Sequence, residues 1–388
     1  MNSLKRRMRA LRAGGVLLVA WYVGLLASTA STASTASTAS TASTASTAST
    51  ASAASVASAA SAASAASAAS VASVASVASV ASTASVISTA FAGQPGDGTQ
   101  PPGFYRQKLG DLTIVALSDG THPFPVDTVF RDVSKDEIRR DLDRAFLEPP
   151  VQGSINAFLV DTGSRRILVD TGAGVLYGDC CGKLLDNLRA AGYAPEQIDE
   201  VLLTHLHKDH VGGIVTDGRM TFPNAVVRVN EIEANYWLDP DHKAQAPAFL
   251  ASFFDAAAAS VAPYVAAGRF RTFRGEATLA PGVRAVPMPG HTPGHTAYLI
   301  ESGDAGLLAW GDIVHVAAIQ LQDPDATVQY DSDADAARRT RRDVLRRVAG
   351  RRYLVGAAHI AFPGLGHLRR DGERYDWVPV NYDATPLR

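Results

Sequence analysis

The chain has 388 residues, with 36 Lys and Arg against 38 Asp and Glu, and two cysteines. Five of the bases lie within the first 12 positions, so 31 bases face 38 acids in the remainder, which excludes the basic surface typical of a nucleic-acid-binding protein. Adjacent cysteines cannot staple distant segments, so a disulfide scaffold is also excluded, and we expect Cys180 and Cys181 to be ordinary thiols.

The N-terminal bases precede an uncharged apolar stretch at residues 13–27, a pattern typical of an export signal. We therefore predict a signal peptide, or alternatively an uncleaved signal anchor, over residues 1–27, and an exported protein that is periplasmic or extracellular, or anchored to a membrane. Residues 28–90 contain only Ala, Ser, Thr, Val and one Ile, in triplets that match neither a helical nor a strand period. Residues 28–100 are thus predicted to be a low-complexity disordered linker, followed by one globular domain over residues 101–388.

In the globular part, short apolar runs alternate with helical segments. Strands are predicted at residues 112–117, 156–160, 167–169, 201–203, 225–229, 283–286, 307–310 and 353–355, and a loop at 356–366. Helices are predicted at residues 183–191, 231–238, 246–267 and 333–348. Two β-rich halves, each followed by helices, predict an α/β layered sandwich with helices outside, rather than one parallel Rossmann sheet. The Gly-rich phosphate-binding signature that would follow a strand in such a sheet is not found.

The segment HLHKDH at residues 205–210 places four metal-binding side chains at the end of a predicted strand. Alternate residues of an extended segment point to the same side, so His205 and His207 can bind one ion while Asp209 and His210 reach a second. Three later segments offer the missing ligands. The predicted sites are His205, His207 and His295 for the first ion and Asp209, His210 and His359 for the second, with Asp312 bridging. Nitrogen and carboxylate ligands with an open position favour two divalent ions, zinc or a similar metal, in a catalytic site.

These motifs, HxHxDH at 205–210, GHTPGH at 290–295, Asp312 and His359, resemble the metallo-β-lactamase-fold hydrolase superfamily. The resemblance implies an αβ/βα four-layer sandwich with a dinuclear site, and it assigns to Asp170 the support of a metal-binding imidazole. The segments LSDGT at 117–121, FPNAVVR at 222–228, FPGLGH at 362–367 and WVPVNY at 377–382 resemble the methyl-parathion-hydrolase-like branch, which is similar in ligand pattern to the acyl-homoserine-lactone lactonases.

The resemblance implies a hydrolase that cleaves ester or lactone bonds by attack of a metal-bound hydroxide. Asp209 and Asp312 are the predicted catalytic carboxylates, because Asp312 bridges the ions and Asp209 can relay a proton to the leaving group. The predicted substrate pocket consists of Tyr177, Trp237, Phe253, Phe254, His315 and Tyr330. His315 and Tyr330 stand where the phosphotriesterase has aliphatic residues, which ranks esters and lactones ahead of phosphotriesters.

Two other functions are kept as alternatives, an organophosphate triester hydrolase and an iron-dependent oxidoreductase of the same fold. Flavodiiron enzymes place Glu where His207 stands, persulfide enzymes bind a single iron, and a true β-lactamase usually has Cys where Asp312 stands. His291 is interpreted as a structural turn residue. The expected partners are a small-molecule ester, lactone or phosphotriester and a second copy in a homodimer, with no nucleic acid and with a membrane only through an uncleaved N-terminal anchor.

Overall fold

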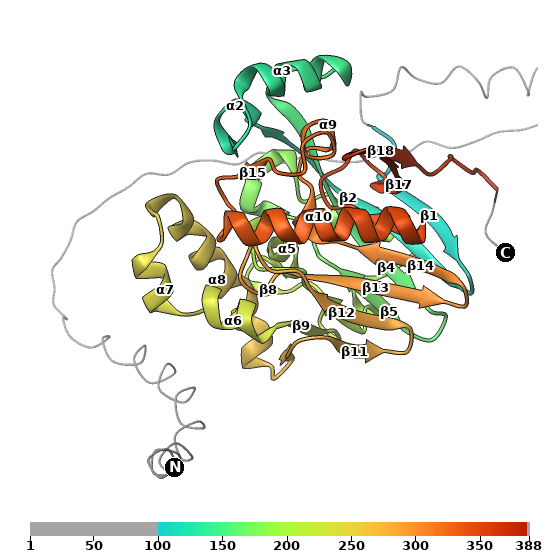
Figure 1. Cartoon of the computed structure of the whole chain (residues 1–388). Coiled ribbons are helices and arrows are strands. Elements are labelled where there is room, and N and C mark those ends of the chain that lie inside the picture. Colours follow the sequence, from blue (N-terminus) through green and yellow to red (C-terminus); the bar gives the residue numbers. More distant parts are fainter. Residues whose placement is uncertain (1–99, 386–388) are drawn as a thin grey trace, which may run out of the picture. The chain divides into compact units, whose positions relative to one another are not determined.

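The computed structural model describes residues 100–385 (Figure 1). The predicted signal peptide or anchor at residues 1–27, and the predicted linker up to residue 99, lie outside the described residues.

Two seven-stranded mixed sheets form the centre of the described part. In the first sheet the strand order is β1 (Phe104–Leu109), β2 (Leu112–Phe124), β4 (Val151–Asp161), β5 (Arg166–Val169), β6 (Glu200–Leu202), β9 (Val226–Asn230) and β10 (Phe270–Phe273). In the second it is β11 (Ala277–Ala280), β12 (Val283–Pro287), β13 (Thr296–Ser302), β14 (Ala305–Ala309), β16 (Leu354–Gly356), β17 (Leu365–Asp371) and β18 (Arg374–Pro379). Parallel pairing runs from β5 through β6 and β9 to β10, and joins β14 to β16. Two small ribbons pair β3 (Phe130–Arg131) with β15 (Thr327–Val328), and β7 (Val215–Thr216) with β8 (Arg219–Met220).

Helices of four to 18 residues connect and cover the sheets. They are α2 (Val126–Val129), α3 (Lys135–Arg144), α4 (Leu184–Ala190), α5 (Lys208–Val211), α6 (Glu231–Trp237), α7 (Pro240–Gln245), α8 (Ala251–Ala266), α9 (Ala317–Gln320) and α10 (Ala334–Arg351). Shorter 3-10 segments are η1 (Gly174–Cys180), η2 (Pro195–Gln197), η3 (Gly212–Ile214), η4 (Ala248–Leu250) and η5 (Gly311–Ile313).

The layering follows from the alternation of apolar side chains along the strands. In β2, Ile114 and Ala116 belong to a core shared with residues of the second sheet, whereas Val115 and Leu117 belong to a core shared with α4 and α8. A third core joins the second sheet to α10, which runs across that sheet in Figure 1. Both faces of each sheet are therefore apolar, as expected for sheets buried on both sides. The predicted αβ/βα sandwich is confirmed.

Most predicted elements coincide with observed ones, and the differences have local causes. The predicted helix at 246–267 begins as α8 at Ala251, because Pro247 is extended and only the 3-10 turn η4 precedes the helix. The predicted loop at 356–366 ends at Leu365, where the β17–β18 hairpin starts. That hairpin carries many charges on its exposed positions, which masks the alternation expected of a strand.

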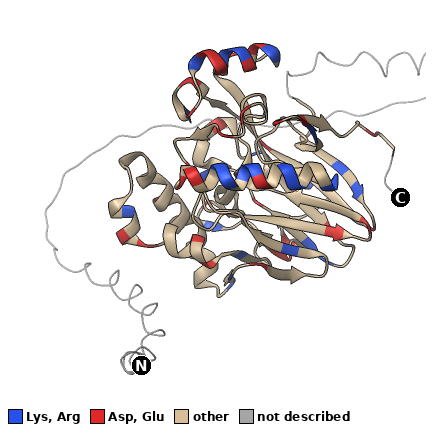
Figure 2. Cartoon of the chain, viewed as in Figure 1, with Lys and Arg blue, Asp and Glu red and all other residues tan. Residues whose placement is uncertain are grey.

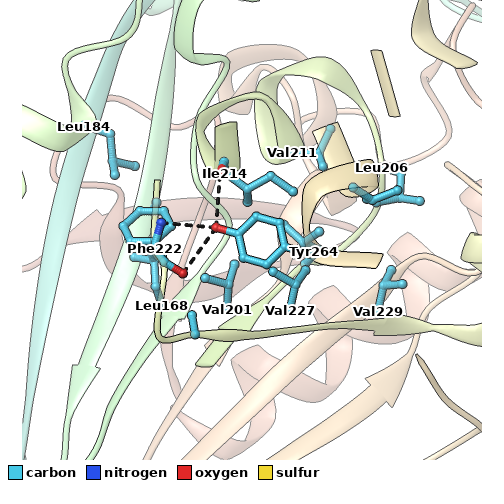
Figure 3. Packing of buried hydrophobic residues seen from close by; sticks show 14 of the residues in the cluster. Leu168, Leu184, Val201, Leu206, Val211, Ile214, Phe222, Val227, Val229 and Tyr264 are labelled. Atoms are coloured by element: carbon cyan, nitrogen blue, oxygen red, sulfur yellow. Dashed lines mark hydrogen bonds between the residues drawn. The ribbon is translucent and has the colours of Figure 1, made fainter. Parts of the chain in front are cut away.

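Helix α8, with η4, is apolar and long enough to cross a membrane by length and composition alone. One side of this helix, including Ala257, Val261 and Tyr264, is buried in the core against the first sheet. The Tyr264 hydroxyl accepts a hydrogen bond from the Phe222 N–H at 3.1 Å and donates one to the Ile214 carbonyl at 3.0 Å (Figure 3). Tyr264 therefore ties α8 to the segment that follows the histidine-rich loop.

We predict that Tyr264→Phe lowers the free energy of unfolding by about 1–3 kcal/mol, because the buried N–H of Phe222 and the carbonyl of Ile214 lose their partner. Urea unfolding followed by circular dichroism measures this. Tyr382→Phe is the matched control, since Tyr382 is 83% exposed. Equal stability of the two variants would contradict the assigned role of the Tyr264 hydroxyl.

Candidate metal centre

The candidate ligands lie together because each follows the C-terminal end of a strand. Strand β6 ends at Leu202 and the chain passes directly into the loop of His205. Asp312 comes just after β14, in the turn η5, and His359 comes after β16. His291 follows β12. The parallel pairing of β14 with β16 keeps Asp312 and His359 at the same sheet edge.

Asp170 organises the loop between β6 and α5. Its Oδ1 accepts a hydrogen bond from the Thr204 N–H, its Oδ2 accepts one from the Thr204 hydroxyl, both at 2.8 Å, and Oδ2 lies 2.9 Å from His210 Nδ1. The Nδ1–H of His210 therefore donates to the carboxylate, and Nε2 is left facing the site. This is the supporting position that the resemblance implies for Asp170.

Two glycines allow this loop to pack closely on its neighbour. A Cβ on Gly213 would lie 2.0 Å from the Thr171 carbonyl oxygen, and one on Gly212 would lie 2.1 Å from that of Ala173. Any larger residue would push the loop of the metal-binding side chains away from the segment after β5.

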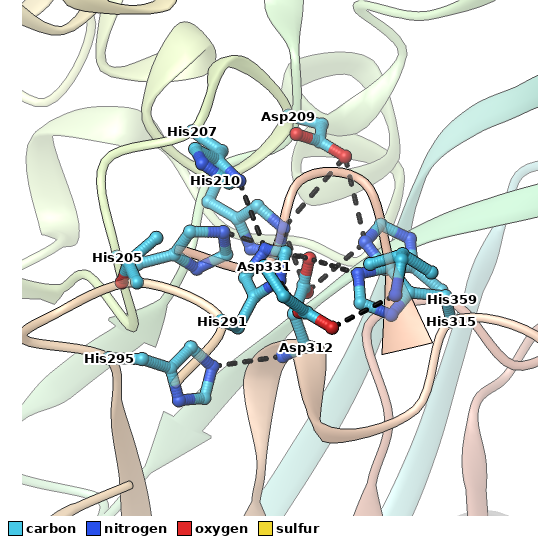
Figure 4. Close-up of polar contacts among 12 residues, drawn as sticks. His205, His207, Asp209, His210, His291, His295, Asp312, His315, Asp331 and His359 are labelled. Atoms are coloured by element: carbon cyan, nitrogen blue, oxygen red, sulfur yellow. Dashed lines mark hydrogen bonds and ion pairs between the residues drawn. The ribbon is translucent and has the colours of Figure 1, made fainter. Parts of the chain in front are cut away.

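The structure brings seven side chains into two adjoining groups of candidate ligands (Figure 4). The donor atoms within each group lie within 4.8 Å of one another. The first group is His205, His207, His291 and Asp312, and the second is Asp209, His210 and His359.

Asp312 lies between the two groups with one carboxylate oxygen toward each. Its Oδ2 is 3.2 Å from His291 Nε2 and 3.6 Å from His205 Nε2. Its Oδ1 is 3.1 Å from His210 Nε2 and 3.2 Å from His359 Nε2. This arrangement is what a bridging carboxylate requires, as predicted for Asp312.

The donor atoms are better suited to binding metal ions than to forming hydrogen bonds with one another. The Nε2 atoms of His205, His207 and His210 and Oδ1 of Asp312 are buried and have no hydrogen-bond partner among the described residues. Burying polar atoms without a partner is costly. Because imidazole nitrogens and carboxylates are the ligands of zinc and similar divalent ions, two such ions would satisfy these atoms.

The electrostatics of the centre favour, for some of its side chains, the protonation state that metal binding requires. Burial, together with the neighbouring imidazoles, lowers the pKa of His205 and His207 well below the usual value, so both rings are neutral and keep a free lone pair. Burial alone would raise the pKa of Asp312, but His210 and His359 outweigh it and hold that pKa well below the usual range. The nearby carboxylate of Asp312 raises the pKa of His210 and of His359 against the effect of burial.

The assignment of His295 as a ligand of the first ion is wrong in this structure. Its Nε2 accepts a hydrogen bond from the Asp312 N–H at 3.0 Å, and its Nδ1 lies 3.2 Å from the Met288 carbonyl (Figure 4). Both ring nitrogens are thus occupied by the backbone, and His295 supports the Asp312 turn instead.

His291, interpreted from the sequence as a turn residue, takes the vacant place in the first group. Its Nδ1 lies 2.9 Å from Asp331 Oδ1, so that the carboxylate orients its Nε2 toward the site. GHTPGH offers two histidines four residues apart, and the motif alone does not distinguish them. The contact with Asp331 distinguishes them, but Asp331 lies 40 residues beyond His291.

Glu233, which the sequence analysis did not single out, joins two of the site loops. Its Oε1 accepts a hydrogen bond from the Leu206 N–H at 3.0 Å. Its Oε2 accepts hydrogen bonds from the Thr292 hydroxyl at 2.7 Å and from the Gly294 N–H at 2.9 Å. A fully buried carboxylate therefore holds the loop after β6 against the loop after β12.

A pocket opens onto both groups. Four of the predicted pocket residues line it, namely Tyr177, Phe253, His315 and Tyr330. The pocket is also lined by His122, Phe124, Pro125, Gly153 and Ile155, and its floor by His207, Asp209, His291, Asp312 and His359. His122, Phe124 and Ile155 were not among the predicted pocket residues; the structure places the first two near the end of β2 and the third in β4.

Trp237 and Phe254 do not line the pocket, which corrects that part of the prediction. Both are buried in the core beneath the site, with ring centroids 4.5 Å apart. The Trp237 ring packs edge-on against His207 at 4.9 Å, so it supports a candidate ligand from behind. Aromatic residues at helical spacing pack into a core more often than they face a ligand, and here Phe253 points to the pocket while Phe254 does not.

Comparisons with known proteins agree with this centre. The family described as the metallo-beta-lactamase superfamily matches residues 150–359. The crystal structure of the hydrolase AbOPH, of the beta lactamase superfamily, is 37% identical, and the match covers 74% of this chain and 100% of that one with a TM-score of 0.71. AidC, a dizinc quorum-quenching lactonase in complex with a product, is 27% identical, covering 72% of this chain and 98% of that one with a TM-score of 0.68.

An N-acyl homoserine lactonase of Bacillus thuringiensis is 25% identical over an alignment of 168 positions that covers 38% of this chain and 59% of the lactonase. The chain spans 38% of the length of one curated relative, a thioesterase of Passalora fulva, and 59–63% of the others compared.

We predict that His291→Ala lowers the metal content of the purified protein by one ion per chain, because the first group loses a ligand. His295→Gln is the matched control in the same motif and should keep the full complement, since a side-chain amide can still donate to and accept from the backbone. Elemental analysis of folded protein decides between them. The opposite pattern would restore His295 as the ligand.

Metal affinity is predicted to fall as the pH falls. Hydrogen bonds to Asp312 and Asp331 raise the pKa of His291 to about 9 despite its burial, and the pKa of His210 and of His359 is raised as well. Below its pKa, each of these rings carries a proton that a metal must displace. Each such proton lowers the metal affinity about tenfold for every unit by which the pH falls below that pKa. Competition with a chelator between about pH 6 and 9 measures this dependence. An affinity that does not change over this range would contradict it.

Proposed function

This chain belongs to the metallo-beta-lactamase superfamily, and from that premise we propose that it is a metal-dependent hydrolase that opens lactones or cleaves carboxylic esters. One observation carries the proposal: Asp312 directs its two oxygens to two separate groups of histidines at the floor of a pocket. A site with a single ion would leave one of these groups without a metal.

The two groups would hold two divalent ions, for which we propose zinc from the nitrogen and carboxylate ligands. When bound, such ions supply a water of lowered pKa and polarise a carbonyl oxygen. His205, His207 and His291, with Oδ2 of Asp312, would hold one ion. Asp209, His210 and His359, with Oδ1 of Asp312, would hold the other.

Tyr177 and Asp209 are the groups of the chain best placed to handle a proton. The Tyr177 hydroxyl lies 3.4 Å from Asp209 Oδ1, at the edge of the pocket. Burial and the nearby Asp209 carboxylate raise the pKa of Tyr177 well above its usual value, so the phenol stays protonated at neutral pH. It can therefore donate a hydrogen bond to a substrate oxygen, while the Asp209 carboxylate can accept a proton from the attacking water and pass it to the leaving-group oxygen.

The pocket walls suit a flat or extended apolar group next to a carbonyl. Phe253 and Tyr330 lie with ring centroids 6.3 Å apart, and Phe124 stacks on His315 at 6.1 Å. His315 also brings a buried polar ring within 3.2 Å of Asp312, where the methyl-parathion-hydrolase-like branch is expected to be aliphatic. We therefore rank lactones and esters above phosphotriesters as substrates. We nevertheless assign the chain to the methyl-parathion-hydrolase-like branch.

Two of the relatives, the dizinc lactonase AidC and the N-acyl homoserine lactonase of Bacillus thuringiensis, support the same ranking. AbOPH, described as a hydrolase, supports hydrolysis without favouring one substrate class. An iron-dependent oxidoreductase has less support, because His207 occupies the position at which flavodiiron enzymes are expected to have Glu. Export of the protein remains a proposal that rests on the charged and apolar pattern of residues 1–27.

We predict that protein loaded with zinc hydrolyses an acyl-homoserine lactone and an aryl carboxylate ester faster than an aryl phosphotriester, as measured by kcat/KM side by side. Asp312→Ala should lose metal and reduce turnover by at least about a thousandfold, because both groups lose their shared carboxylate. Tyr382→Phe, purified and loaded with zinc in the same way, serves as the control and should keep the wild-type activity. Preference for the phosphotriester would reverse the ranking of substrates, and full activity of Asp312→Ala would exclude the two-ion proposal.

A further inference from the structure

The two cysteines of the chain lie behind the pocket wall, next to the lining residues Tyr177 and His122, with their sulfur atoms in contact. Cys180 ends η1 and Cys181 follows it in an extended conformation. The two Sγ atoms are 2.9 Å apart, and both residues are free thiols. This contact is unexpected from the sequence alone, since adjacent residues are usually too close along the backbone for their side chains to bridge.

The backbone on either side holds the thiols in this arrangement. Gly120 of β2 packs directly against the pair, since a Cβ there would lie 2.1 Å from the Cys180 carbonyl oxygen and 3.0 Å from the Cys181 Cα. The next segment is held by Asp119, whose carboxylate accepts hydrogen bonds from the Gly182 and Leu184 N–H groups. Contacts with the first sheet thus hold the backbone from which the two side chains extend.

The two thiols differ in their access to solvent. Cys180 is half-buried, whereas Cys181 is only 8% exposed. Burial raises the pKa of the Cys181 thiol well above its usual value. A reagent from solution would therefore meet the Cys180 sulfur first, and Cys181 would react only with what Cys180 has bound.

The pair is directly connected to the pocket. The Cys180 Sγ lies 3.9 Å from His122 Nδ1, and it donates a hydrogen bond to the Tyr177 carbonyl at 3.3 Å. The rings of His122 and Tyr177, both pocket residues, pack with centroids 4.8 Å apart. A covalent change at Cys180 would thus act on the wall that positions the Tyr177 hydroxyl.

We propose that Cys180 and Cys181 are a modification site, at which exchange with a low-molecular-weight disulfide forms a reversible vicinal disulfide directly behind the pocket residues His122 and Tyr177. The Cys180 thiolate attacks one sulfur of the small disulfide, which forms a mixed disulfide and releases one thiol. The Cys181 sulfur then attacks the Cys180 sulfur, which forms the Cys180–Cys181 bond and releases the second thiol. Two electrons and two protons pass from the protein to the reagent, which leaves as two thiols.

The test uses the full chain and glutathione disulfide as the probe. Because the chain has two cysteines, an intramolecular disulfide can only join Cys180 to Cys181. We expect the intact mass to fall by two hydrogen atoms, both titratable thiols to be lost, and dithiothreitol to restore them. Trypsin should release the bond within the single peptide of residues 167–183.

Cys181→Ser is the matched control, since it keeps the accessible Cys180 and removes the second sulfur. It should stop at a stable adduct of one glutathione, a species that the wild-type protein forms only transiently. A stable glutathione adduct on the wild type, a disulfide-linked dimer, or two thiols that stay unreacted in the folded protein would each overturn the proposal. These readouts are masses and thiol counts, so they do not depend on the proposed hydrolase activity.

A kinetic comparison tests the connection to the pocket. Oxidation of the wild type should change KM for a hydrolysed ester or lactone, whereas the same treatment of the double variant Cys180→Ser, Cys181→Ser should leave KM unchanged. An identical KM for the oxidised and reduced wild type would show that the bond does not reach Tyr177.

Discussion

The buried carboxylate of Asp312 is the constraint on which the rest of the site depends. It is 4% exposed and lies within 3.6 Å of the ring nitrogens of His205, His210, His291, His315 and His359. A single carboxylate cannot satisfy so many buried imidazoles, and several of their nitrogens keep no partner among the described residues. Such a concentration of unpaired ligand atoms is costly in a folded protein unless metal ions complete it.

Other buried carboxylates lie behind the histidines and orient their rings. Asp170 orients His210, Asp331 orients His291, and Glu233 joins the loops that carry them. Asp170 acts between segments of the first sheet, whereas Glu233 joins a loop of the first sheet to a loop of the second, so the site is assembled only when both sheets are packed together. The centre is therefore rigid on its metal side, and the aromatic wall of the pocket is left to determine which substrate fits.

That wall combines apolar and polar groups. Phe253 and Tyr330 offer aromatic surface, while His122, Tyr177 and His315 add polar atoms, and His315 lies 3.2 Å from the Asp312 carboxylate. Such a mixture suits a substrate with an apolar body and a carbonyl that reacts at the metal side. Because Tyr177 belongs to the same 3-10 segment as Cys180, the chemistry of the sulfur pair and the shape of the pocket are linked through a few residues of backbone.

Local patterns in the sequence were sufficient for the layered α/β sandwich, for the HxHxDH loop and for including Asp312 among the candidate ligands, because apolar alternation and ligand spacing act over a few residues. They were not sufficient to choose between His291 and His295, which share one motif. That choice depends on which ring meets Asp331 and which meets the backbone of Asp312 and Met288. Local patterns likewise did not decide whether Phe253 or Phe254 faces the pocket, and they did not predict the contact between the two cysteine sulfurs. Each is decided by partners tens of residues away, and only the packing of the two sheets brings those partners into reach.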